Sequence, residues 1–82
     1  MLKDSKIKSD HYISIGKNIQ KLRQEHSYTQ AYMIREMQLL GCKTTKQNYS
    51  KYEKDLAHIS ASELVAIAKI LNVSLSELFF KQ

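Results

Sequence analysis

The sequence predicts an all-α fold, a compact bundle of five helices. Apolar residues recur at spacings of three and four, as in the stripe formed by Ile15, Ile19 and Leu22, and this period is typical of helices with one buried face. No stretch alternates apolar and polar residues over the length of a strand, and no Asn-Gly or Asp-Gly turn is present. The absence of proline removes the strongest interruption of helices.

The length of 82 residues predicts one domain, which we place at residues 11–82 after a polar and flexible arm at residues 1–10. A net charge of +5 favours polyanionic partners, either nucleic acid or, less often, an acidic membrane surface. The single cysteine excludes an internal disulfide. Apolar runs are too short to cross a membrane and the start has no apolar signal region, so we expect a cytoplasmic protein.

The helix boundaries follow from periodicity and from capping residues. Thr29 and Thr45 are suitable N-caps for the second and third helices. "SASE" from Ser60 and "SLSE" from Ser74 are capping boxes for the fourth and fifth, because the serine hydroxyl and the glutamate carboxylate satisfy each other's backbone amides. The expected helices cover about residues 12–26, 30–39, 46–54, 61–71 and 75–80.

The third helix has a composition suited to reading DNA. It is only about 12 Å long, so it must be held by its neighbours, and Tyr49 and Tyr52 have the spacing to face inward. The side chains left outside are Lys46, Gln47, Asn48, Ser50 and Lys51. Glutamine and asparagine pair with the edge of adenine, and lysine pairs with guanine or phosphate. A helix about 10 Å wide also fits a major groove about 12 Å wide.

From Ile15 to Phe79 the chain resembles the Xre/Cro–CI family of helix-turn-helix DNA-binding domains, typified by lambdoid phage repressors. The matching pieces are "IGKNIQKLRQEHSYTQ", "TTKQNYSKYEK" and "ISASELVAIAKILNVSLSELF". The resemblance implies a sequence-specific regulator of transcription that binds duplex DNA, and a repressor of a bacterium, phage or mobile element. Since one reading helix covers few base pairs, we expect a homodimer on half-sites about 34 Å apart.

The resemblance also implies roles for individual residues. The base-reading positions fall on Lys46, Gln47, Asn48 and Lys51. The positions that contact DNA phosphates fall on Thr29, Gln30, Lys43, Thr45 and Lys54. A buried ion pair typical of the family corresponds to Arg23 and Glu53.

The chain departs from the phage repressors between its second and third helices. The segment "QLLGCKT" replaces a tight turn and adds about five residues, while Ile34 and Gln38 replace the small residue and the glycine usual at their positions. This longer turn bears on the angle of the reading helix. The alternative function is a protein-interaction adaptor, or an antitoxin-type module, that uses the same fold without reading DNA.

Nothing in the sequence predicts an enzyme or a cofactor. No nucleophile, base and orienting group occur in a recognisable pattern. Cys42 has no partners spaced for a metal or redox site, and His11, His26 and His58 are scattered, so we expect no metal and no small-molecule substrate. The lysines of the N-terminal arm, Lys3, Lys6 and Lys8, fit a frayed terminus better than an arm that enters a DNA groove.

Overall fold

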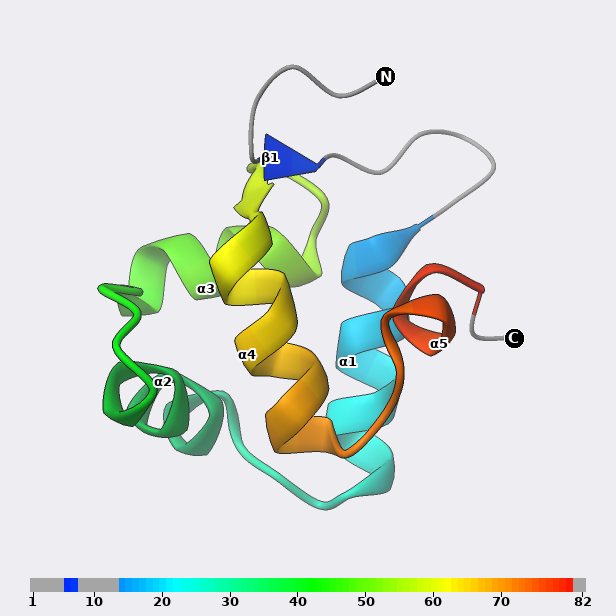
Figure 1. Ribbon diagram of the computed structural model, residues 1–82, viewed down its shortest axis with the longest axis horizontal. Coiled ribbons are helices and arrows are strands. Elements are labelled where there is room, and N and C mark those ends of the chain that lie inside the picture. The colour runs from blue at the N-terminus through cyan, green and yellow to red at the C-terminus, as the bar shows by residue number, and fades with distance from the viewer. Residues whose placement is uncertain (1–5, 8–13, 81–82) are drawn as a thin grey trace.

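The computed structural model describes residues 6–7 and 14–80, and within them the fold is the expected bundle of five helices (Figure 1). The helices are α1 (Ile15–Glu25), α2 (Gln30–Leu39), α3 (Lys46–Glu53), α4 (Ala61–Leu71) and α5 (Leu75–Phe80). Two short strands, β1 (Lys6–Ile7) and β2 (Ile59–Ser60), complete the described elements. The predicted all-α class and the order of the helices are confirmed.

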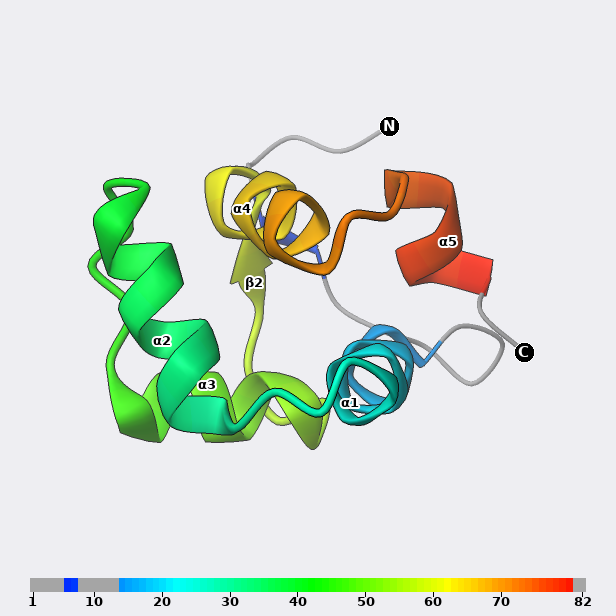
Figure 2. The ribbon, with the colours of Figure 1, turned by 90° about the horizontal axis from the view of Figure 1, so that it is seen from below.

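The helices surround one apolar core. In Figure 2, α1 and α3 lie along one side, α4 and α5 lie along the other, and α2 closes one end. Side chains from all five helices and from β2 fill the centre, with Ile19, Met33 and Leu78 completely buried. The remaining core residues are Ile15, Leu22, Met37, Tyr49, Tyr52, Ile59, Leu64, Ala66, Ile67, Ala68 and Leu71.

The helices begin at the capping residues that the sequence indicates. The Thr29 hydroxyl accepts a hydrogen bond from the backbone nitrogen of Tyr32, and the Thr45 hydroxyl accepts one from that of Asn48. Both capping boxes are formed: Ser60 pairs with Glu63 at the start of α4, and Ser74 pairs with Glu77 at the start of α5. These bonds satisfy amides that have no acceptor within the helix.

Two features differ from the expectation. The pair of strands was not foreseen: Lys6 and Ile7 pair in antiparallel register with Ser60 and Ile59. Strands of two residues are too short to show an alternating pattern, so periodicity could not reveal them. In addition, α1 begins at Ile15 rather than near residue 12, because the backbone of Ser14 has a non-helical conformation and occupies the N-cap position.

Several sequence expectations fall outside the described part of the chain. Lys3, Lys8 and His11 lie there, as does the expected flexible arm at residues 1–10 apart from the β1 backbone.

At the C-terminal end of the described chain, Phe79 packs against the core and Phe80 is 61 % exposed. Within residues 6–7 and 14–80, no helix is both long and apolar enough to cross a membrane.

Candidate nucleic-acid interface

Three buried side chains set the rotation of α3 about its axis. Tyr49, Tyr52 and Glu53 are 0, 5 and 4 % exposed, and the two tyrosine rings meet edge to face at 6.4 Å between centroids. The Tyr52 hydroxyl donates a hydrogen bond of 2.8 Å to Glu63 Oε2 on α4. Because these anchors lie on one side of a short helix, the opposite side of α3 is turned to solvent.

The solvent-facing side of α3 carries a hollow that we call the outer hollow. Successive residues of a helix are rotated by about 100°, which places Gln47, Lys51 and Lys54 opposite the buried anchors. Lys46 and Ser50 lie beside them, and Lys46 is on the side that faces α2. The outer hollow is lined by Lys46, Gln47, Ser50, Lys51, Lys54 and Leu56. Its lining holds three lysines and no acidic side chain, which suits a polyanion.

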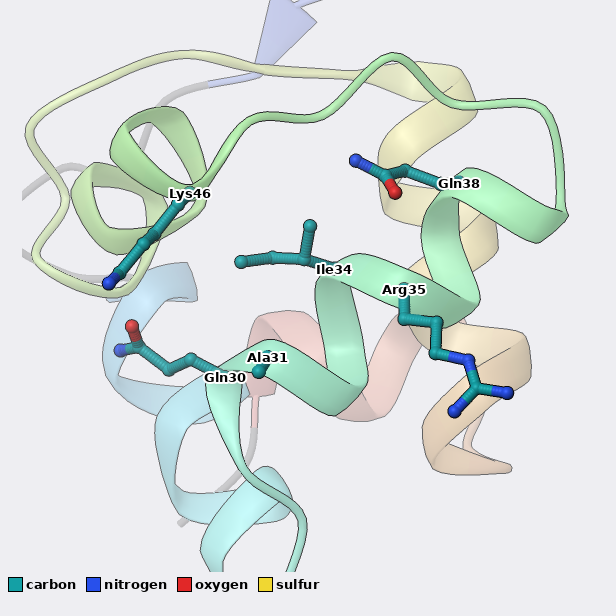
Figure 3. A pocket seen from close by; sticks show the side chains of 6 residues that line it. All are labelled: Gln30, Ala31, Ile34, Arg35, Gln38 and Lys46. Atoms are coloured by element: carbon teal, nitrogen blue, oxygen red, sulfur yellow. The ribbon is translucent and has the colours of Figure 1, made fainter.

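A second hollow lies between α2 and α3, and we call it the interhelix hollow. Its lining comprises Gln30, Ala31, Ile34, Arg35, Gln38 and Lys46, and Figure 3 shows these side chains. Gln30 and Lys46 extend toward each other across the gap, while Arg35 points away from it (Figure 3). Lys46 therefore borders both hollows and links the start of α2 to the outer face of α3.

Gln30 stands at the start of α2, where a helix can bind an anion. The first amides of a helix have no internal acceptor and carry partial positive charge. One hydrogen of the Gln30 side-chain amide is already used, because Nε2 donates to Glu53 Oε1 at 3.0 Å. The second hydrogen on that nitrogen is still a donor, so the bond orients the side chain without removing its capacity to bind phosphate.

The lengthened turn is fastened to the rest of the protein at three points. Gly41 has a φ of +95°, which turns the chain after α2. The backbone nitrogen of Cys42 then donates a hydrogen bond of 3.0 Å to Met37 O. The Gln38 side chain then donates to Thr44 O at 3.0 Å. Thr44 is itself buried, and its hydroxyl donates to Glu63 Oε2 at 2.8 Å. The added residues thus form an ordered connection that ends where α3 begins.

Ile34 occupies the space that the longer turn leaves between α2 and α3. Figure 3 shows its side chain projecting from α2 into the interhelix hollow. The side chain is partly buried against the core. A branched residue at this position keeps the two helices apart, since side chains between helices set the distance between their axes.

Two of the predicted site residues border a different hollow. Lys43 and Asn48 border a third hollow on the turn side of α3, together with Leu40, Gly41, Cys42, Tyr52, Ser60, Ser62 and Glu63. The outer hollow thus brings together Lys46, Gln47, Lys51 and Lys54. Lys43 and Asn48 flank that group instead of joining it. Thr45 is exposed and uses its hydroxyl oxygen to cap α3, which leaves its proton able to bond a phosphate.

Arg23 and Glu53 form a buried ion pair between α1 and α3. Arg23 Nε donates to Glu53 Oε2 at 2.6 Å, and the two side chains are 12 % and 1 % exposed. The hydrogen bond to Glu53 is the main cause of a raised pKa for Arg23. Arg23 also donates from Nη1 to Tyr28 O at 2.8 Å, which ties the loop before α2 to the same cluster.

Sequence reasoning missed Leu56, which lines the outer hollow although it is 69 % exposed. Leu56 belongs to none of the apolar stripes that predicted the core. The only signal was its position, as an isolated leucine directly after the lysine-rich helix. Among residues 6–7 and 14–80, no cluster of three metal-binding side chains occurs.

Comparison with protein families shows which family the chain belongs to. Residues 19–78, which include all of α2, α3 and α4, match the family model described as helix-turn-helix. The chain belongs to the helix-turn-helix family. This confirms the resemblance to the Xre/Cro–CI type. The helix-turn-helix protein is therefore a DNA-binding regulator, from a family that is generally not enzymatic. Comparisons with curated proteins and with solved structures give no match.

Proposed function

We propose that the protein is a sequence-specific repressor of transcription that places the outer face of α3 in the major groove of duplex DNA. The observation that carries this proposal is the rotation of α3. Tyr49, Tyr52 and Glu53 are all buried on one side, and the hollow on the side that remains is lined by three lysines, one glutamine, one serine and one leucine. That side combines the donors and acceptors that base edges require with charge that attracts phosphates.

We assign base reading to the outer face of α3. Gln47 can form two hydrogen bonds with one adenine, while Lys46 and Lys51 can donate to guanine. Asn48 borders the hollow on the turn side of α3, and we assign it to a base at the edge of the same site. The proposed base-reading set is thus Lys46, Gln47, Asn48 and Lys51.

We assign the phosphate contacts to residues on both sides of that face. Gln30 and Thr29 lie at the start of α2, where helix amides favour an anion. Lys43 and Thr45 precede α3, and Lys54 follows it. Contacts before and after the reading helix would fix its register along the duplex without adding sequence information.

We further propose that two copies bind together in the cytoplasm of a bacterium, on chromosomal, phage or other mobile DNA. The eight residues of α3 span about 12 Å, which is the length of only a few base pairs. Two such helices on half-sites about 34 Å apart would read enough sequence to distinguish an operator. No small-molecule substrate or cofactor is part of this proposal.

The test is a selection from random duplexes. Purified protein is bound to a pool of random duplexes at low salt, bound DNA is amplified, and the cycle is repeated. The proposal predicts a consensus with two related half-sites. Recovery of sequences no different from the starting pool would contradict it and would favour the adaptor function. The observation that supports an adaptor is the pair of exposed leucines at the end of α2, Leu39 at 71 % and Leu40 at 50 %.

A further inference from the structure

The backbone at the end of α3 holds Leu56 in a defined place. Asp55 adopts a left-handed conformation with φ of +59°. The Leu56 amide donates to Lys51 O at 2.9 Å, and the Asp55 amide donates to Tyr52 O at 3.2 Å. These two bonds form a Schellman motif, which ends a helix and fixes the direction of the chain that follows.

A second set of bonds fastens this segment to α1. Asp55 Oδ1 accepts a hydrogen bond of 2.8 Å from the backbone nitrogen of Gly16. Asp55 Oδ2 accepts one of 2.7 Å from the Ser14 hydroxyl. Asp55, the residue immediately before Leu56, is therefore hydrogen-bonded to the start of α1. Leu56 thus follows a segment whose backbone position is fixed.

The side chain of Leu56 is nevertheless turned to solvent. It is 69 % exposed, and it borders the outer hollow together with Lys51 and Lys54. It is the single apolar side chain in the lining of that hollow. A leucine in this position contributes little to the core, and it offers an apolar contact to a ligand that enters an otherwise polar hollow.

We propose that Leu56 contacts the 5-methyl group of a thymine in the major groove and makes the protein prefer thymine at that position. The proposal rests on the function proposed above. Thymine is the base that presents a methyl group in the major groove, next to the edges that polar side chains read. Leu56 lies beyond the end of α3, at the opposite end from Gln47. It therefore reads a different base pair from Gln47 and lengthens the recognised sequence.

The experiment removes the methyl group alone. Each thymine of the selected duplex is replaced in turn by deoxyuridine, which keeps every hydrogen-bonding group, and affinity is measured for the unmodified protein and for Leu56→Ala. One replacement should weaken binding of the unmodified protein by about three- to fivefold, as expected for one buried methyl group. The same replacement should leave the affinity of Leu56→Ala unchanged. Leu56→Met, which keeps an apolar side chain, should retain part of the effect.

Leu39→Ala is the matched control, because Leu39 is a leucine of similar exposure, 71 %, that lines none of the three hollows described above. It should respond to deoxyuridine as the unmodified protein does. If the protein selects a consensus but Leu56→Ala keeps every deoxyuridine penalty, or if no penalty exists, the role of Leu56 is wrong and the proposed function stands. If the protein selects no consensus, both proposals are wrong.

Discussion

Arg23 donates two hydrogen bonds to Glu53, from Nε to Oε2 at 2.6 Å and from Nη2 to Oε1 at 3.1 Å. These bonds join α1 to the last turn of α3. The same carboxylate accepts a hydrogen bond from the side-chain amide of Gln30 at the start of α2. One buried side chain thus sets the position of three helices, and two of them carry the proposed DNA contacts. The ion pair belongs to the architecture of the site even though neither partner faces the DNA.

Replacing Glu53 by alanine should destabilise the protein strongly. The substitution leaves a mostly buried guanidinium without its partner, and breaking such a pair costs about 3–5 kcal/mol in the free energy of unfolding. An exposed pair would cost less than about 1 kcal/mol. Thermal and urea unfolding of Glu53→Ala, Arg23→Ala and the double variant measure the coupling. If both single variants unfold like the parent, the pair contributes nothing to stability.

Gly16 and Gly41 should respond differently to alanine. A Cβ on Gly16 would collide with Tyr52 O and come within 2.8 Å of Glu53 O, because the start of α1 passes against the end of α3. Backbone atoms there cannot yield without moving a helix, so Gly16→Ala should lower the melting temperature markedly. Gly41→Ala meets no atom within 4 Å and has only the strain of a positive φ, about 1–2 kcal/mol. Equal melting temperatures for the two variants would show that the close approach is absent.

Stability should depend on the ionisation of Glu63. Burial opposes ionisation of this carboxyl, but hydrogen bonds from Ser60, Tyr52 and Thr44 outweigh it and lower its pKa below the usual 4.5. A group with a lowered pKa in the folded state stabilises the protein above its unfolded pKa, and this contribution is lost as pH falls further. We therefore expect the melting temperature to fall below about pH 4.5.

The variant Glu63→Gln isolates that contribution. It should melt below the parent at neutral pH and show a weaker decline in acid, because the amide cannot titrate. Glu77→Gln is the matched control, since Glu77 closes the same kind of capping box with Ser74 on α5. It should lower the melting temperature at neutral pH less than Glu63→Gln does, because the capping box of Glu77 is exposed. Identical pH profiles for Glu63→Gln and the parent would refute the role of Glu63.

Binding to duplex DNA should weaken steeply as salt is raised. Lys43, Lys46, Lys51 and Lys54 are all exposed on or beside α3. Each phosphate that a lysine neutralises contributes about −0.9 to the slope of log affinity against log salt, so four contacts per protomer predict a slope near −3 to −4. Titrations at several salt concentrations measure it. A slope near zero would mean that phosphates do not contribute to the complex.

Much of the fold could be predicted because its signals are local. The capping boxes at Ser60 and Ser74 allow the first residues of α4 and α5 to be predicted from the sequence. The spacing of Tyr49 and Tyr52 likewise predicts which side of α3 is buried. Such signals depend on residues three or four apart, which is the range over which a helix brings side chains together.

Other features could not be predicted because they depend on contacts between distant segments. Leu56 joins the outer hollow only because Asp55 is tied to Ser14 and Gly16, about forty residues away. Lys43 is separated from the lysines of α3 by the path of the lengthened turn, which Thr44 and Glu63 hold in place. Neither arrangement leaves a periodic pattern in the sequence.

The measurement that tests the central claim most directly compares Gln47→Ala with Lys43→Ala on the selected duplex and on a scrambled one at matched salt. Loss of Gln47 should cost about 1–3 kcal/mol on the selected site and little on the scrambled one, because its amide reads a base edge. Loss of Lys43 should weaken both duplexes about equally and reduce the salt slope by about one, because it meets a phosphate. If Gln47→Ala weakens both duplexes equally, α3 does not read bases.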